Sequence, residues 1–222
     1  MRPIVRLVGI LLLCLAGGAY SVSPPGTGVE IPAGFSADFS RLNAGYRANL
    51  RVGEGFGKGP ALASSVPKSI RLPVLLAASI DRQSVIDGSG FESRLFGSYA
   101  GGTMAAYYQE ASRGHFSLSG DVHGWYDLPQ AIAYYTRGGP LGDESLFPES
   151  PGGMVAHAVA AADSGVDFGL YDNDGPDGVP NSGDDDGVVD ALIVVHTGGD
   201  AAAGDNGNIW SHTGRLGANS VA

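Results

Sequence analysis

The chain has 222 residues, of which 43% are hydrophobic and 16% are charged, and its formal net charge at pH 7 is −10. A chain of this length can bury one sizeable core, because it removes roughly 70% of its unfolded surface from water. The excess of acidic residues argues against a nucleic acid partner, which requires a basic surface. The single cysteine, Cys14, excludes an internal disulfide framework.

Residues 1–21 have the three-part order of a secretory signal. Arg2 and Arg6 flank the start of an apolar run over residues 7–15, and small residues suited to cleavage follow it. The run is shorter than the roughly 20 residues that cross a bilayer. We therefore expect residues 1–21 to be a signal peptide and the mature protein to be secreted, with no membrane attachment after cleavage.

The next segment, residues 22–66, is rich in Gly, Ser, Pro and Ala and shows little apolar periodicity. This composition is typical of a loosely ordered leader or propeptide remnant. We expect the ordered domain to occupy residues 67–222. Its first element is an apolar run at residues 71–78, which has the length of a buried strand.

A helix and a second strand are expected next. Thr103 is a candidate N-cap for a helix over residues 104–113. Hydrophobic and polar residues then alternate from residue 115 to residue 123, as they do in a half-buried strand. On that strand, His115 and His123 would share the polar face.

Two further elements complete the pattern. Residues 154–162 are rich in alanine and favour a helix, and residues 188–196 form a second continuous apolar run. His196 would end that strand and bind the local backbone. The order strand, helix, strand, helix, strand predicts an α/β or α+β domain with a mixed sheet.

Acidic residues are concentrated in the C-terminal part of the chain. Between Arg137 and Arg215 there are 14 Asp and Glu residues and no Lys or Arg. Residues 172–175 read D-N-D-G and residues 186–190 read D-G-V-V-D, which together match the first half of a calcium loop if the segment between them is looped out. Hard carboxylate oxygens suit Ca²⁺. The predicted calcium ligands are Asp172, Asp174, Asp177, Asp184, Asp186 and Asp190.

This acidic segment has a simpler alternative. It lacks the glutamate that ends a standard calcium loop, so it is not an EF-hand. A solvated acidic turn without a cation would also account for its composition. The mutual repulsion of closely spaced carboxylates favours the bound cation.

Several sequence blocks occur in a fixed order. The first is A-Y-Y-Q-E-A-S-R-G-H-F-S-L-S-G-D-V-H-G-W-Y at residues 106–126. Later blocks are Tyr134-Tyr135, residues 166–168, residues 171–175, residues 186–192 with His196, and N-I-W-S-H at residues 208–212. Behind a signal peptide, and over roughly residues 70–215, this order resembles the immune inhibitor A family of secreted zinc metallopeptidases.

The resemblance implies part of a zincin-like catalytic domain. Family members carry an H-E-x-x-H helix that supplies two zinc ligands and a general base. None of the five histidines here is followed by Glu or has a second histidine four residues on, so we assign no catalytic residue. We expect this chain to end before the zinc helix, to bind no Zn²⁺ and to be inactive alone. The complete protein would cleave extracellular proteins or peptides and be stabilised by calcium.

Other functions remain open at this point. A secreted, non-enzymatic calcium-binding or adhesion module could use the same scaffold, and a degraded fragment could fail to fold. His115 and His123 are too far apart along one strand to chelate an ion unaided, and His212 fits either a place near the cleft or a structural role. Serine catalysis is not supported, because no G-x-S-x-G motif occurs.

Overall fold

A computed structural model describes residues 10–14, 69–84, 86–173, 177, 179, 182–185 and 187–214. The strands are β1 (Ile10–Cys14), β2 (Ser69–Ala78), β3 (Ser117–Asp127), β4 (Leu192–His196) and β5 (Thr213–Gly214). The α-helices are α2 (Ser89–Leu95), α3 (Met104–Ala111), α4 (Ile132–Tyr135) and α5 (Pro151–Ala162). Short 3-10 helices are η1 (Glu144–Leu146), η2 (Phe168–Tyr171) and η3 (Ala201–Ala203).

The strands form one mixed sheet in the order β3-β2-β4-β1-β5. Neighbouring strands from β3 to β1 are parallel, and only the short β5 runs antiparallel to its neighbour among these strands. Val74 of β2 lies opposite Val122 of β3 on one side and Ile193 of β4 on the other. The α/β class with a mixed sheet that the sequence predicted is confirmed.

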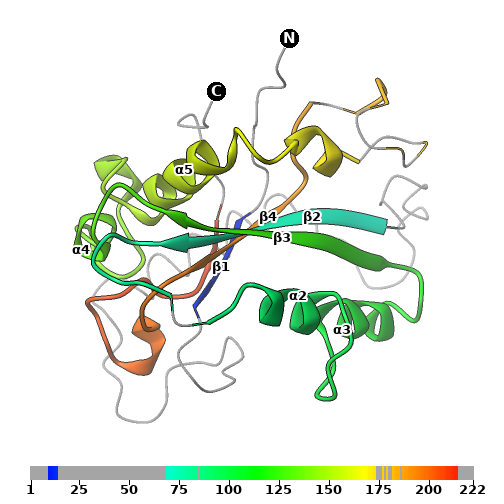
Figure 1. Ribbon diagram of the computed structural model, residues 1–222, viewed down its shortest axis with the longest axis horizontal. Coiled ribbons are helices and arrows are strands. Elements are labelled where there is room, and N and C mark those ends of the chain that lie inside the picture. Colours follow the sequence, from blue (N-terminus) through cyan, green and yellow to red (C-terminus); the bar gives the residue numbers. More distant parts are fainter. Residues whose placement is uncertain are drawn as a thin grey trace, which may run out of the picture.

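Helices cover both faces of the sheet. Leu75 and Ala77 of β2 belong to the apolar cluster under α5, whereas Val74 and Leu76 belong to the cluster with α2. Figure 1 shows α5 on one side of the sheet and α2 and α3 on the other. Because both faces are covered, β2 and β4 are continuous apolar runs rather than alternating ones.

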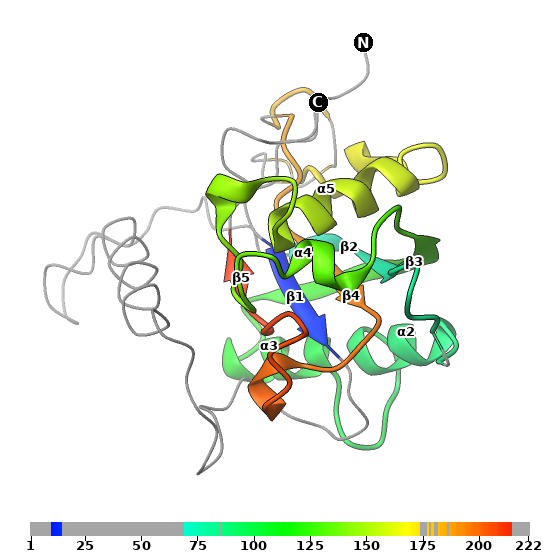
Figure 2. The ribbon, with the colours of Figure 1, turned by 90° about the vertical axis from the view of Figure 1, so that its left-hand side faces the viewer.

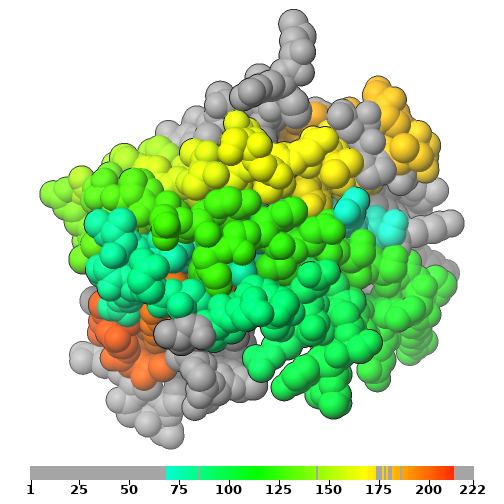
Figure 3. Space-filling view, viewed as in Figure 1, coloured from blue at the N-terminus to red at the C-terminus, as the bar shows by residue number. Residues whose placement is uncertain are grey.

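Strand β3 lies at the edge of the sheet, and its start differs from the prediction. Figure 3 shows β3, in green, at the surface between α5 and the helices α2 and α3. The strand begins only at Ser117, because Arg113 and Gly114 take left-handed backbone angles, with φ of 56° and 79°, in a turn after α3. His115 is therefore exposed before the strand, and the prediction that it shares a strand face with His123 is wrong.

Both predicted helices are present. The Thr103 hydroxyl accepts a hydrogen bond from the Ala106 N–H at 3.0 Å, which confirms the N-cap of α3. Helix α5 starts three residues before the expected position, with Ser150 as its N-cap and Pro151 in its first turn. Strand β4 begins at Leu192 rather than 188, because Asp190 donates its N–H to the Tyr171 carbonyl.

Residues 10–14 lie inside the predicted signal peptide and form β1. The strand pairs in parallel with β4, from Ile10 opposite Leu192 to Cys14 opposite His196, and Figure 2 shows it between β4 and β5. Cleavage of a signal peptide would remove this neighbour of β4. The predicted leader at residues 22–66 is outside the described residues. In the described part of the chain, no helix is long and apolar enough to span a membrane.

Candidate functional site

The parallel strands give the sheet an amino end and a carboxyl end, and polar side chains gather at both. The acidic segment after η2 lies at the amino end, where Asn173 exchanges hydrogen bonds of 3.2 and 3.3 Å with the backbone of Arg71 in β2. Residues after β2 and β4 meet at the carboxyl end. There, the Thr197 N–H donates to the Ala77 carbonyl at 3.0 Å. In open α/β sheets, ligands bind at this carboxyl end.

At the amino end, the first and last predicted calcium ligands, Asp172 and Asp190, lie on neighbouring backbone segments. Asp172 is only 3% exposed, and its Oδ2 accepts a hydrogen bond from the Gly187 N–H at 2.8 Å. Asp190 Oδ2 accepts one from the Asn173 N–H at 3.1 Å. These two bonds join the backbone around residues 172–173 to the backbone around residues 187–190.

The middle aspartates of this loop bind neighbouring groups of the loop itself. Asp184 accepts hydrogen bonds from the Asp177 N–H at 3.3 Å and from the Ser182 hydroxyl, which lowers the pKa of its carboxyl. Asp185 accepts one from the Ser182 N–H at 2.9 Å. Asp177 and Asp184 are exposed.

Four of the six predicted calcium ligands lie within the described residues. Asp174 and Asp186 are outside the described residues. Within the described ranges, no three His, Cys, Asp or Glu side chains come close enough together to hold a metal ion. The calcium assignment of the six aspartates therefore stays a prediction.

A charged network that sequence reasoning missed joins the acidic loop to the sheet edge. Asp121 Oδ2 accepts hydrogen bonds from Arg71 Nε at 2.8 Å and from the Tyr171 hydroxyl at 3.0 Å. Because the hydroxyl proton points to the carboxylate, His123 Nε2–H is the donor in its 2.8 Å contact with the Tyr171 oxygen.

Electrostatics in this network follow from its contacts. The hydrogen bond from Arg71 is the main influence that lowers the pKa of Asp121, although partial burial opposes it. Burial raises the pKa of Tyr171, and the hydrogen bond to Asp121 adds to the effect. The network is a neutral tyrosine between an ion pair and a histidine.

At the carboxyl end, His196 is almost completely buried, with 2% of its surface exposed. Its Nδ1 lies 3.0 Å from the Thr197 carbonyl, which can only accept, so Nδ1 carries the proton and Nε2 carries a lone pair. Burial lowers the pKa of His196 and keeps the ring neutral. The predicted contact with local backbone is confirmed. Nε2 has no hydrogen-bond partner in the described structure.

Asn208 fixes the loops around this histidine. Its Oδ1 accepts hydrogen bonds from Arg82 Nη1 at 2.6 Å and from the Gly199 N–H at 3.2 Å, and the side chain is fully buried. Gly198 has a φ of 115°, and a Cβ there would lie 2.8 Å from the same oxygen, so only glycine fits. The N-I-W-S-H block contains Asn208, but its sequence alone does not indicate the contact with Arg82.

Asp200 holds Ser211 of this block. Its Oδ2 accepts the Ser211 hydroxyl at 2.8 Å, and its Oδ1 accepts the Ala202 N–H at 2.9 Å. His212 Nδ1 lies 2.6 Å from the Trp210 carbonyl and therefore also carries its proton on Nδ1. These contacts give the block a structural role in positioning the loops after β4.

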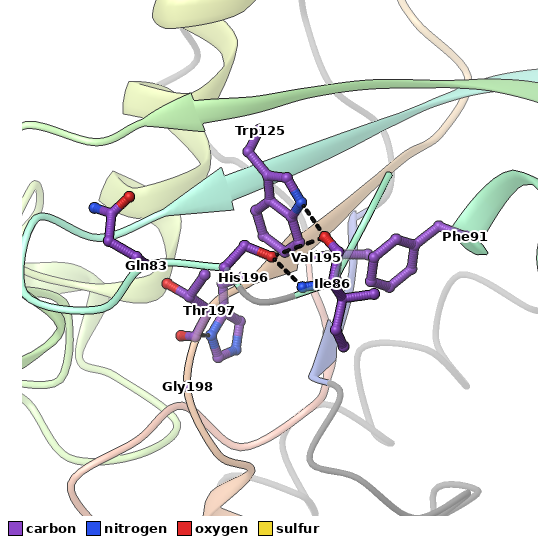
Figure 4. Close-up of a pocket in the computed structure, with 9 residues that line it drawn as sticks. Gln83, Ile86, Phe91, Trp125, Val195, His196, Thr197 and Gly198 are labelled. Carbon is purple, nitrogen blue, oxygen red and sulfur yellow. Dashed lines mark hydrogen bonds between the residues drawn. The ribbon is translucent and has the colours of Figure 1, made fainter. Parts of the chain in front are cut away.

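A pocket of about 130 Å³ opens beside His196. Figure 4 shows the imidazole across the pocket from Ile86 and Phe91, with Trp125 beside them. The Trp125 indole N–H donates a hydrogen bond to the Ile86 carbonyl at 2.9 Å, which holds these two pocket-lining residues together. The described residues that line the pocket are Gln83, Ser84, Ile86, Phe91, Trp125, Val195, His196, Thr197 and Gly198.

Comparisons with known proteins agree with the resemblance. Residues 86–222 match the family described as "Immune inhibitor A peptidase M6, catalytic domain". The chain is 34% identical to Immune inhibitor A of Bacillus thuringiensis subsp. alesti over 119 residues, which are 50% of this chain and 17% of that protein. It is 31% identical to the pre-pro-metalloprotease PrtV of Vibrio cholerae serotype O1 (strain M66-2) over 124 residues, which are 52% of this chain and 13% of that protein. The aligned part is thus less than a fifth of each relative.

Proposed function

Because the chain belongs to the immune inhibitor A family of peptidases, M6, we propose that the complete protein hydrolyses peptide bonds in other proteins. The observation that carries this proposal is the match to the family's catalytic domain over residues 86–222, which includes the acidic loop and the carboxyl-end loops. We also propose that the protein is secreted, on the basis of the signal-like residues 1–21.

We propose zinc as a cofactor of the complete protein and not of this chain alone. Zinc supplies a Lewis acid and an activated water in metallopeptidases. The residues of this chain do not fit a zinc site, since none of its histidines belongs to an H-E-x-x-H motif and the described part holds no group of three metal ligands. We assign no catalytic step to them. Their proposed contribution is the sheet and core on which the catalytic residues would be placed.

The decisive experiment compares two proteins. The product of the complete gene should degrade an unstructured protein such as casein, lose that activity with a zinc chelator and regain it when Zn²⁺ is restored. The 222-residue chain should show no activity in the same assay. A complete gene without H-E-x-x-H, or a complete protein that binds calcium but cleaves nothing, would instead favour the non-enzymatic module.

Calcium is the second part of the proposal, at the loop between Asp172 and Asp190. Two observations support it. Two hydrogen bonds place Asp172 and Asp190, the first and last predicted ligands, on neighbouring backbone segments. Asp172 is a nearly buried carboxylate, and such groups require close compensation of their charge.

Thermal unfolding of the 222-residue chain tests the calcium site. A ligand that binds only the folded state at a hundred times its dissociation constant stabilises it by about 2.7 kcal/mol, so Ca²⁺ should raise the melting temperature by several degrees. Asp172→Asn should abolish the rise. Asp163→Asn, which changes an exposed aspartate at the end of α5, should leave it intact. An equal rise in both variants would contradict the assignment of Asp172.

A further inference from the structure

The place of β1 in the sheet conflicts with the signal-like character of the same residues. Ile10–Cys14 pairs in parallel with β4 along its whole length and antiparallel with β5 at its start, and Figure 2 shows it between these two strands. Neighbouring strands lie about 4.8 Å apart, so a gap of about 10 Å separates β4 from β5 once β1 is removed. Removal of residues 1–21 on secretion, a part of the proposed function on which this site depends, opens that gap. We call the gap between Leu192–His196 and Thr213–Gly214 the strand slot.

Strand β4 lacks the features that protect the edge of a sheet. Leu192 and Val194 belong to the apolar cluster under α5, and Ile193 and Val195 belong to the cluster with α2, so both faces of β4 pack in the core. The strand contains no proline and no Asp, Glu, Lys or Arg, and its pairing with β1 has a continuous register. The edge strand β3, in contrast, carries Asp121 and has a register shift in its pairing with β2. Because natural proteins protect edge strands with such charges and bulges, β4 is built as an internal strand with a neighbour on each side.

The backbone and the surroundings of the strand slot define what can fill it. Alternate residues of β4 direct their N–H and C=O groups away from β2, and these groups need partners because the strand is buried. An extended segment supplies such partners by strand addition. A charged side chain on that segment would lose its hydration beside the apolar clusters. The slot therefore fits an extended, uncharged and mainly apolar segment of five residues, the length of β4.

Strand β5 indicates where this segment comes from. Thr213–Gly214 pairs antiparallel with β1, which runs parallel to β4. Consecutive strands often lie side by side in a sheet and are antiparallel when a short turn joins them. A segment that follows β5 after such a turn runs antiparallel to β5 and parallel to β4, which is the direction that β1 has in the slot.

We propose that the strand slot is a strand-acceptor site, which Ile10–Cys14 fills before the leader is cleaved and an apolar strand from beyond residue 222 of the complete protein fills afterwards. The leader strand thus holds a place in the sheet that a later strand takes over. Both occupants run parallel to β4 and contribute one strand between β4 and β5.

Hydrogen exchange of the 222-residue chain, produced without export so that it keeps residues 1–21, tests the first occupant. Successive N–H groups of a strand point to opposite neighbours, so prolines at both Leu11 and Leu12 remove a bond to β4 whichever of the two donates it. Leu11→Pro/Leu12→Pro should speed exchange of the Leu192–His196 amides at least about tenfold. Leu11→Val/Leu12→Val keeps residues that favour strands and should leave the exchange unchanged. Equal protection of β4 in the two variants would overturn the proposal.

Exchange in the distant strand β3 shows whether the proline variant stays folded. If Ser117–Asp127 also loses protection, a soluble peptide that carries residues 10–14 between lysines should restore protection of both strands when it is added to the variant. The same peptide with the two prolines should restore neither. Failure of the unaltered peptide to restore protection would overturn the proposal.

The secreted complete protein tests the second occupant. Mass spectrometry of its N-terminus should show that residues 1–21 are absent, and its β4 amides should be as protected as those of the unaltered 222-residue chain. The proline variant contains every position up to 222, so protection that it lacks and the complete protein has comes from the downstream part. Retained leader residues would overturn the signal peptide and the strand replacement together, whereas rapid exchange of β4 in the cleaved protein would overturn the strand replacement alone.

Sedimentation of the same protein separates an internal strand from a strand of a second copy. Protection of β4 in a monomer, independent of protein concentration, supports a strand from the same chain. Protection that appears only with a dimer would assign the strand slot to a second copy and overturn the proposed source.

Discussion

The Arg71–Asp121 ion pair at the amino end of the sheet is open to water, whereas the His196 and Asn208 side chains at the carboxyl end are buried. At the amino end, the Arg71 and Asp121 side chains of the ion pair are 42% and 37% exposed, and two of the described aspartates of the acidic loop are exposed. At the carboxyl end, His196, Thr197 and Asn208 are all less than 10% exposed. Water can replace a lost contact of this ion pair but not a lost contact of His196 or Asn208, so the hydrogen bonds of the two groups contribute unequally to stability.

Asn208→Ala should have the largest effect and tests the buried end. The substitution leaves the Gly199 N–H and the Arg82 guanidinium without their acceptor. We expect the free energy of unfolding to fall by about 3 kcal/mol, measured by urea denaturation. Asn206→Ala changes an exposed asparagine two residues away and should cost less than about 0.5 kcal/mol. Equal costs would remove the contrast between the two ends.

The pH dependence of the free energy of unfolding should show the next largest difference between the two ends of the sheet. His196 has a lowered pKa in the folded protein, so the unfolded chain binds more protons below its ordinary pKa near 6.5. Its contribution is present above that pH and is lost as the pH falls, by up to about 1.4 kcal/mol per pH unit.

Chemical denaturation from pH 7 to pH 5 measures this slope. His196→Asn should flatten it. His157→Asn provides the comparison for a second histidine whose pKa burial lowers, at a half-buried position. A slope unchanged by His196→Asn would show that the carboxyl end does not resist protonation.

Asp121→Asn should have the smallest effect and tests the exposed end. Its folded pKa is lowered, chiefly by the hydrogen bond from Arg71, so its contribution is present above pH 4 and is lost as the pH falls further. Because both partners are more than a third exposed, the loss at pH 7 should be below about 1 kcal/mol and should shrink with salt. Asp127→Asn, at an exposed acid of the same strand, is the control. A salt-independent loss of several kcal/mol would mean that this end behaves as a buried one.

Local patterns in the sequence were sufficient for the α/β class, the two main helices and the central strands. The apolar runs of β2 and β4 indicate strands covered on both faces, and Thr103 marks the start of α3 by its own hydrogen bond. The spacing of the aspartates after Tyr171 also indicated the acidic segment, whose hydrogen bonds join residues only 15 and 17 positions apart. These features depend on chemistry between near neighbours in the chain.

Only the tertiary structure decided which distant polar groups meet. Arg71 contacts Asp121 because β2 and β3 pair in parallel, and Arg82 reaches Asn208 across 126 positions because two loops fold over the same end of the sheet. The proton on Nδ1 of His196, the unpartnered buried Nε2 and the pocket that this residue lines follow from the packing at that end. Burial and strand register are properties of the packed sheet, and no local run of residues encodes them alone.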